Sequence, residues 1–172
     1  RTVRDAISDI QDIEPGKEVT DSYFTLPPHP EAQGLEKELR GRCLHNHITT
    51  ATRETALSRF KALKAGENFH DLSPELKTTY SNAERTQNTI YMRLKYDEPS
   101  GTVVNVRKSM WIHPELDRAI SIREAARLQT FPDSFIFEGT KDSQYQQVGN
   151  AVPPFLAKAV AESIISILDQ VQ

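Results

Sequence analysis

The chain has 172 residues, of which 37% are hydrophobic and 26% charged, as in a globular protein with a sizeable core. A single cysteine excludes an internal disulfide framework, and the apolar runs are too short to predict a membrane span, so we expect an intracellular, cytoplasmic protein. The net charge of −3 does not favour a nucleic-acid partner, but residues 1–38 sum to −5, residues 39–128 to +5 and residues 129–172 to −3. The middle of the chain can therefore carry a basic face, although solvated helix faces would give the same count.

The first residues predict one short helix and then a connector. Thr2 is a suitable cap for a helix over residues 3–10. Pro15 and Gly16, and then three prolines within residues 27–30, are incompatible with a long regular element. Residues 11–38 are therefore predicted to be a connector and not a stable unit.

The next segment contains Cys43, His45 and His47, whose spacing could suggest a metal site. Zinc sites usually need a further pair of ligands at a set distance, and none follows, so we expect no metal. Cys43 is interpreted as a structural thiol and not as a nucleophile.

Helices and a hairpin are predicted between residues 50 and 106. Thr50 or Thr52 can cap a helix that runs to about Leu63, and Ser73-Pro74 can start a short helical turn towards Tyr80. Apolar and polar residues alternate over 89–96, which predicts a half-buried strand. The β-branched residues within 102–106 are predicted to pair with it.

Two helix starts bracket an aromatic segment near the end of the chain. Ser121 and Glu124 form an S-x-x-E capping pattern, and Pro132 predicts that this helix ends near Thr130. Gly149-Asn150 predicts a turn ahead of Pro154, which is suited to the first turn of a last helix. That helix carries an apolar stripe that requires a large partner surface, so we expect the stripe to be exposed or covered by another copy; it comprises Leu156, Val160, Ile164, Ile167, Leu168 and Val171.

Several of these motifs together resemble one known family. The run R-x-I-S-I-R-E-A-A-R-L-Q-T-F-P-D-S-F at 118–135 and the run Q-x-Q-Q-V-G-N-A-V-P-P at 144–154 resemble the ninth and tenth sequence blocks of the DNA cytosine-5 methyltransferases. The run R-L-K-Y-D-E-P-S-G-T-V at 93–103 is similar to a segment of that family's target-recognition region, and His113-Pro114 precedes Arg118 as in the family's H-P-x-x-R element.

The resemblance implies an α/β-class, mixed α+β fragment in three parts. Residues 1–38 would connect from the catalytic domain, and residues 39–138 would form the target-recognition lobe, with short strands and helices. Residues 139–172 would return to the catalytic domain through a C-terminal helix that packs on it. That Rossmann-like catalytic domain would lie outside this chain.

The resemblance also implies a reaction, in which a methyl group passes from S-adenosylmethionine to C5 of a flipped cytosine in duplex DNA. The family's cysteine after proline, its E-N-V glutamate and its glycine-rich cofactor turn do not occur in this sequence. The chain is therefore not expected to be catalytically competent alone. Its expected partners are duplex DNA and the N-terminal catalytic portion, or a complementary subunit, with no membrane and with self-association of the last helix as a possibility in isolation.

The resemblance also implies site residues, through their positions in the matching motifs. The family's G-N-x-V turn lies at the S-adenosylmethionine pocket, which implies a cofactor contact for Asn150, Ala151 and Val152. The family's threonine beside the DNA backbone matches Thr102. The other predicted DNA contacts are basic residues in the middle of the chain: Arg40, Arg42, Arg93, Arg107 and Lys108. The predicted scaffold, whose side chains bond mainly within the protein, comprises Arg118, Arg123, Glu124 and Gln129.

Several alternatives stay open. Asn150 can simply be a turn residue, Thr102 can be a β-branched residue that begins a strand, and Phe131, Pro132 and Phe135 favour a core role over base stacking. The whole chain can be a non-catalytic DNA-binding module with the same fold, or a structural or regulatory partner that never touches DNA. Salt-dependent DNA binding separates the last possibility from the others.

Overall fold

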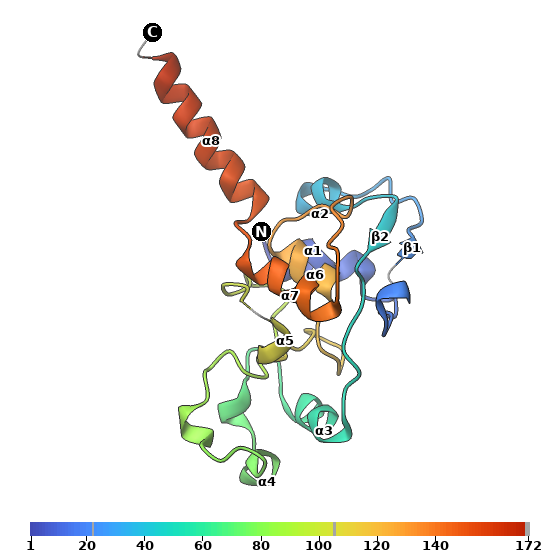
Figure 1. Ribbon diagram of the computed structural model, residues 1–172, viewed down its shortest axis with the longest axis vertical. Helices are drawn as coiled ribbons and strands as arrows, with labels where there is room; N and C mark the ends of the chain where they lie inside the picture. The colour runs from blue at the N-terminus through green and yellow to red at the C-terminus, as the bar shows by residue number, and fades with distance from the viewer. Residues whose placement is uncertain (22, 105, 171–172) are drawn as a thin grey trace.

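The computed structural model describes residues 1–21, 23–104 and 106–170, and its elements surround two main apolar clusters (Figure 1). Helices dominate, and the sheet consists of β1 (Tyr23–Thr25) and β2 (Cys43–His45), paired antiparallel with Phe24 opposite Leu44. The mixed α+β prediction is therefore confirmed. Short 3-10 turns lie at Ser8–Ile10, Val19–Asp21, Phe69–Asp71 and Ala83–Arg85.

The larger cluster lies between α1 (Val3–Ile7), α2 (Gly34–Leu39) and α6 (Ile122–Leu128). Thr2 caps α1 as predicted, with its hydroxyl on the amide of Asp5, and the Asp5 carboxylate accepts from the Thr2 amide in return. Trp111 is fully buried in this cluster. The N-terminal helix thus forms part of the core and is not a loose end.

The prediction that residues 11–38 form no stable unit is wrong at two places. Strand β1 pairs with β2, and α2 buries Leu35 and Leu39 against the larger cluster. The prolines exclude helix only within residues 27–30. The two leucines, four positions apart, have a core to enter that local sequence does not reveal.

The second cluster lies in the lower part of Figure 1, around α3 (Glu54–Ala62) and α4 (Pro74–Lys77). Phe60, Phe69 and Tyr91 form its aromatic centre, and Ile112 links it to the rest of the protein. Both predicted helices are confirmed, although Arg53 and not a threonine occupies the cap position of α3.

The predicted strand at 89–96 and its hairpin partner at 102–106 are wrong. The first segment makes only an isolated bridge, from Arg93 to Ile112, and Tyr91 has a positive φ of 54° that interrupts extended backbone. Residues 102–104 form no strand, Asn105 lies outside the described residues, and Val106 begins α5 (Val106–Ser109). The apparent alternation fails because Arg93 is a buried residue, as shown below.

The last two helices are α7 (Lys141–Asn150) and α8 (Pro154–Asp169). Contrary to the predicted turn, Gly149 and Asn150 complete α7, which Thr140 caps, and the chain turns only at Ala151. Helix α8 starts at Pro154 as predicted and projects away from the body (Figure 1), while Val171 lies outside the described residues. The described part of its apolar stripe is exposed, between 52% at Val160 and 62% at Ile167, which confirms the expected exposure.

Candidate functional site

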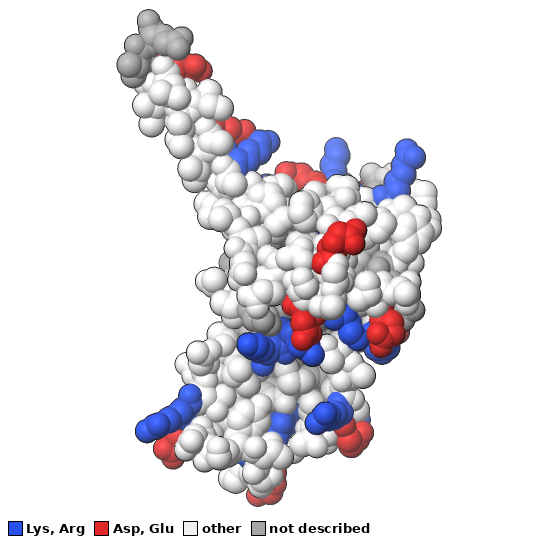
Figure 2. Space-filling view, viewed as in Figure 1, with Lys and Arg blue, Asp and Glu red and all other residues white. Residues whose placement is uncertain are grey.

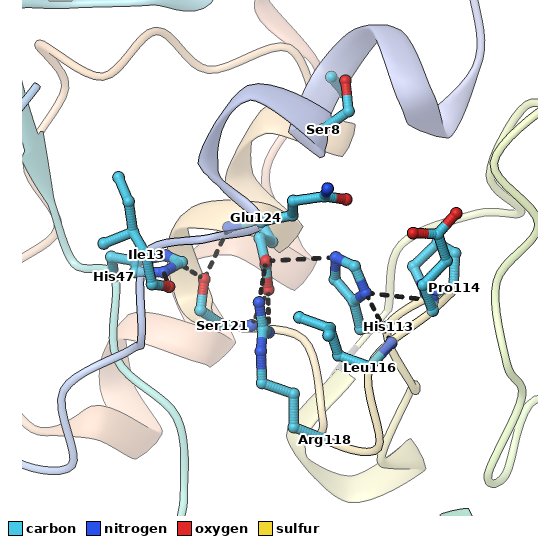
Figure 3. A network of polar contacts seen from close by, with 12 residues as sticks. Ser8, Ile13, His47, His113, Pro114, Leu116, Arg118, Ser121 and Glu124 are labelled. Atoms are coloured by element: carbon cyan, nitrogen blue, oxygen red, sulfur yellow. Dashed lines mark hydrogen bonds and ion pairs between the residues drawn. The ribbon is translucent and has the colours of Figure 1, made fainter. Parts of the chain in front are cut away.

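A buried ion pair anchors the start of α6 (Figure 3). The guanidinium of Arg118 donates two hydrogen bonds to the Glu124 carboxylate, at 2.8 and 2.7 Å. The same carboxylate accepts from the Ser121 amide at 2.7 Å, and the Ser121 hydroxyl accepts from the Glu124 amide at 3.0 Å. The predicted capping box is therefore present, and it is built around a carboxylate that solvent does not reach.

His47 fixes one side of this cap. Its Nε2 donates to the Ile13 carbonyl at 2.9 Å, so Nδ1 carries no proton and accepts from the Ser121 hydroxyl at 2.9 Å. Both ring nitrogens of His47 are thus hydrogen-bonded to protein atoms. This structural role accounts for His47 without a bound metal. Burial lowers the pKa of this ring, which favours the neutral form.

His113 fixes the other side. Its Nδ1 accepts from the amides of Glu115 and Leu116 at 3.2 and 3.1 Å, so Nε2 carries the proton and points towards the Tyr96 hydroxyl at 3.3 Å and Glu124 at 3.9 Å. Burial, reinforced by Arg118 and Arg93, lowers the pKa of His113 to about 4 against the opposing effect of Glu124. Burial would raise the pKa of Glu124, but Arg118 outweighs it and lowers that pKa to about 2.

Two further arginines of α6 hold segments that are distant in sequence. Arg127 donates to both oxygens of Asp133, at 2.9 and 2.6 Å, and to Asp9 at 2.5 Å. Arg123 donates to main-chain carbonyls, among them those of His45 at 2.7 Å and Pro132 at 2.9 Å. Burial lowers the pKa of Arg123 to about 10, and the neighbouring Arg127 adds to this effect, while Asp133 at 3.8 Å opposes it.

Asn46 is a polar residue that sequence reasoning missed. It has a positive φ of 60°, and its side chain donates to the Phe137 carbonyl and to Gln144 and accepts from the Phe137 amide and Arg123. Asp9 and Asp133 were missed as well. Their signal in the sequence is weak, because their partners lie up to 118 residues away.

Two of the predicted DNA contacts lie inside the protein. Arg93 donates to the carbonyls of Leu63, Phe60 and His113 at 2.7 to 3.0 Å and pairs with Asp117 at 2.6 Å. The side chain of Arg40 is only 9% exposed, and it pairs with Asp9 and donates to the Pro27 carbonyl. The donors of Arg93 are directed to carbonyls at the end of α3 and near His113, and those of Arg40 to Asp9 and to an exposed loop carbonyl.

The other predicted DNA contacts are exposed. Arg107 and Lys108 belong to α5, and Arg107 makes an ion pair with Asp142 of α7. Thr102 precedes α5, and Arg42 lies beside the proline-rich loop.

A groove of about 480 Å³ runs between α3, α5 and α7, and it brings Arg107 and Lys108 opposite Arg53. Figure 2 shows basic side chains at the narrow part of the molecule, between the upper body and the part that contains α3 and α4, with acidic side chains beside them. Among the described residues that line the groove there is no carboxylate. Its polar lining consists of Arg53, Arg59, Arg107, Lys108, Thr50, Thr52, Thr55 and Thr79, of which Arg59 is buried and donates to Thr79. The rest of the lining is apolar or aromatic: Ala51, Ala56, Tyr91, Val106, Met110, Ala119 and Tyr145. Thr102 and Arg42 do not line it.

The predicted cofactor residues lie at the junction of α7 and α8. Asn150 is exposed, and its side-chain carbonyl accepts from Gln146 at 2.8 Å, which leaves its amide N–H groups to donate. Val152 is 64% exposed, and Ala151 is half-buried. Gln129 lies beneath this turn and donates to the Val148 carbonyl at 2.7 Å.

Comparisons of the sequence and the fold with known proteins identify relatives of this chain. The C-5 cytosine-specific DNA methylase family matches residues 5–166 of the chain. The chain belongs to that family. It is 36% identical to the type II methyltransferase M.DdeI of Desulfomicrobium norvegicum, over 95% of this chain and 42% of that protein. It is 34% identical to DNA (cytosine-5)-methyltransferase 4 of Arabidopsis thaliana, over 95% of this chain and 12% of that protein.

A solved structure gives the same fold for this methylase chain. The crystal structure of a putative DNA modification methyltransferase encoded within an E. coli prophage superposes with a TM-score of 0.73 at 24% identity. The superposition covers 97% of this chain and 47% of that one. The methylase chain thus spans less than half the length of the relatives it matches, and the resemblance noted from its motifs is confirmed.

Replacing Glu124 is expected to be costly to the methylase fold. Glu124→Gln removes the charge that pairs with Arg118 and leaves a buried guanidinium uncompensated, so the free energy of unfolding should fall by about 3 kcal/mol in urea denaturation. Glu98→Gln is the matched control, because its pair with Lys95 is exposed and should change stability by less than about 1 kcal/mol. Equal losses in the two variants would contradict a central role for the buried pair.

The neutral histidines predict a pH dependence of stability. The folded-state pKa of His113, about 4, lies below the unfolded value of roughly 6.5, so its stabilising contribution is complete above the unfolded value and is lost as the pH falls towards the folded one. The expected loss is ~3 kcal/mol. His113→Asn keeps an acceptor for the amides of Glu115 and Leu116 but does not titrate, so its unfolding free energy should fall less over this range. The same slope in both proteins would rule out His113 as its source.

Proposed function

We propose that this chain is the C-terminal, target-recognition part of a DNA cytosine-5 methyltransferase, with residues 1–38, 39–138 and 139–172 as connector, recognition lobe and return segment. The complete enzyme would transfer a methyl group from S-adenosylmethionine to C5 of a flipped cytosine in duplex DNA inside the cell. The chain would not catalyse this alone. Family membership and the partial coverage of longer relatives support this proposal.

The observation that carries the proposal is the uncovered apolar face of α8. Within its described length no residue of α8 is buried, although its side chains are as apolar as those of a core helix. Exposed apolar stripes of this kind mark docking surfaces. We assign the stripe to the catalytic domain, which would cover it and bring the recognition lobe beside the reacting base.

A membrane is the competing partner for this segment. By length and composition alone, Lys141–Asp169 is apolar enough to cross a bilayer. However, the segment is interrupted at 151–153, and the 16 residues of α8 extend only about 24 Å, less than the ~30 Å of a hydrocarbon core. Lys158 and Glu162 also lie within α8. Docking on a protein surface therefore fits better than spanning.

The groove between α3, α5 and α7 is our candidate for the DNA-facing surface. Cations attract phosphates, and threonine hydroxyls donate to phosphate oxygens, so the polar part of the lining, with Arg53, Arg107 and Lys108, suits a sugar–phosphate backbone. The apolar part of the lining would face the sugars. Arg107 would exchange its pair with Asp142 for a phosphate. Thr102, which precedes α5, is proposed to contact the strand near the flipped base.

The chain's own residues would contribute recognition and closure. Extracting a base from the stack costs roughly a few kcal/mol, and contacts to flanking phosphates offset part of that cost. Arg118, Arg123, Glu124 and Gln129 would hold the recognition lobe in one position relative to the return segment.

The α7–α8 turn is proposed to form one edge of the cofactor pocket. Asn150 offers a free amide donor beside the exposed side chain of Val152, and a polar donor next to apolar surface suits a nucleoside. S-adenosylmethionine, when bound, supplies the methyl group. The remainder of its pocket would come from the catalytic domain.

Complementation tests this proposal. Mixing the chain with the N-terminal portion of a close relative, which carries the catalytic cysteine, should restore transfer of a radiolabelled methyl group to cytosine in duplex DNA. Ile164→Glu with Leu168→Glu should abolish both complementation and co-elution of the two portions, because charges cannot be buried on an apolar surface. Lys158→Glu, a charge change on the same helix, is the control. Failure of the folded wild-type pair to transfer methyl groups would reject the proposal, as would binding of the chain to vesicles alone.

The groove predicts salt-dependent DNA binding by the 172-residue chain. Each phosphate contact removed should reduce the slope of log affinity against log salt by about 0.9. Arg53→Ala combined with Arg107→Ala should therefore lower the slope by about 2 in fluorescence anisotropy. Lys158→Ala, which removes a cation far from the groove, should leave it unchanged. An unaltered slope in the double variant would exclude the groove as the DNA site.

A further inference from the structure

The end of α6 is bonded to the junction between α7 and α8. Gln129, only 6% exposed, directs its amide nitrogen to the Val148 carbonyl at 2.7 Å and lies 3.5 Å from the Ala151 carbonyl. The last carbonyls of a helix lack partners within that helix. Gln129 therefore supplies a donor to the end of α7 from a neighbouring element.

The side chain of Thr130 caps the start of α8. The residue at the cap position of α8 is Pro153, whose side chain cannot accept a hydrogen bond, and Pro154 has no amide hydrogen to offer. Phe155 is thus the first residue of α8 with an amide, and it donates to the Thr130 hydroxyl at 3.2 Å. The cap of α8 is provided by a residue 25 positions earlier in the chain.

The backbone of Thr130 indicates that this contact is specific. Its φ is 64°, in the left-handed region, which a β-branched residue rarely adopts and glycine adopts without steric cost. A threonine at this position is unfavourable for the backbone alone. The bond from Phe155 to its hydroxyl gives a reason for threonine here.

The base of α8 is where its direction is set. No described residue of α8 is buried, and among them Phe155 alone packs against the larger apolar cluster, with Arg1 over its ring at 5.1 Å. Because α8 projects from the body (Figure 1), a small change of angle at its base moves its far end by a large distance.

We infer that Gln129 and Thr130 are positioning residues that set the direction of α8 and the shape of the Asn150–Val152 turn. They act as a clamp, one on each side of that turn. The consequence for methyl transfer rests on the proposed function: the clamp would present the cofactor edge and the docking stripe to the catalytic domain in a single arrangement. The geometric part of the inference does not depend on that function.

Distance measurements between two spin labels test the geometry on the full 172-residue chain. Labels are placed at Lys37→Cys on α2 and Ser166→Cys on α8, in a Cys43→Ser background. We expect one narrow distance distribution for the intact clamp and for Thr130→Ser, which keeps the hydroxyl. Thr130→Val and Gln129→Met should broaden or shift it. Thr130→Gly relieves the backbone but lacks the hydroxyl, so it should behave like Thr130→Val. Distributions identical to the parent in Thr130→Val and Gln129→Met would overturn the inference.

The reconstituted enzyme tests the consequence. With the N-terminal portion, Thr130→Val and Gln129→Met should raise the KM for S-adenosylmethionine about fivefold, the effect of losing one hydrogen bond. Thr130→Val should leave the KM for DNA unchanged, because Thr130 does not hold the recognition lobe. Leu72→Ala, in the second cluster, is the control for lost stability and should lower the melting temperature without changing that KM. A KM for S-adenosylmethionine that does not respond to the clamp variants would contradict the inference. If the parent chain itself failed to restore activity, the proposed function would fail, and the distance measurements would decide the inference alone.

Discussion

The fold depends on the buried pair between Arg118 and Glu124. The carboxylate closes the cap of α6 through the amide of Ser121, and the two neighbouring histidines connect that cap to segments near Ile13 and Tyr96. A buried ion pair is often no more stabilising than apolar side chains would be, because desolvation is costly. In this protein the ion pair mainly fixes the orientation of the groups around it. One charged centre specifies how several segments that are distant in sequence meet.

The other arginines show how a chain with little sheet satisfies its buried backbone. Helix ends, strand ends and irregular segments all contain buried carbonyls, and such groups are costly to bury without a donor. Arg93 donates hydrogen bonds to the carbonyls of Phe60, Leu63 and His113. Arg123 donates to the carbonyls of His45 and Pro132. Much of the positive charge in the middle of the chain is therefore inside the protein. The basic surface that stays exposed is correspondingly smaller than the composition suggests, and Arg53, Arg107 and Lys108 of that surface line the groove beside α5.

Several segments that are distant in sequence meet at α6. Its first residues are fixed by the buried pair, its arginines hold Asp133 and Asp9, and its last residues reach the junction of α7 and α8. The turn between α7 and α8 and the first residue of α8 with an amide are thus both bonded to the end of one short helix. In the proposed enzyme, such a helix would hold the recognition lobe and the docking helix at a constant separation without contacting either ligand.

Local signals were sufficient for some of this structure. The capping boxes at Thr2 and Ser121 and the proline at the start of α8 act within a few residues, so the sequence alone located those helices, the apolar stripe and the family. Tertiary structure decided the rest. Residues 89–96 alternate as a strand would, yet Arg93 is buried because carbonyls 20 to 33 residues away need its donors. Leu35 and Leu39 lie on a helix because they can be buried against α1 and α6. Helix α7 continues through Gly149, and Gln129 donates to the Val148 carbonyl near its end. Which arginines stay on the surface and which hold the fold together depends on those distant carbonyls, and periodicity in the sequence cannot report them.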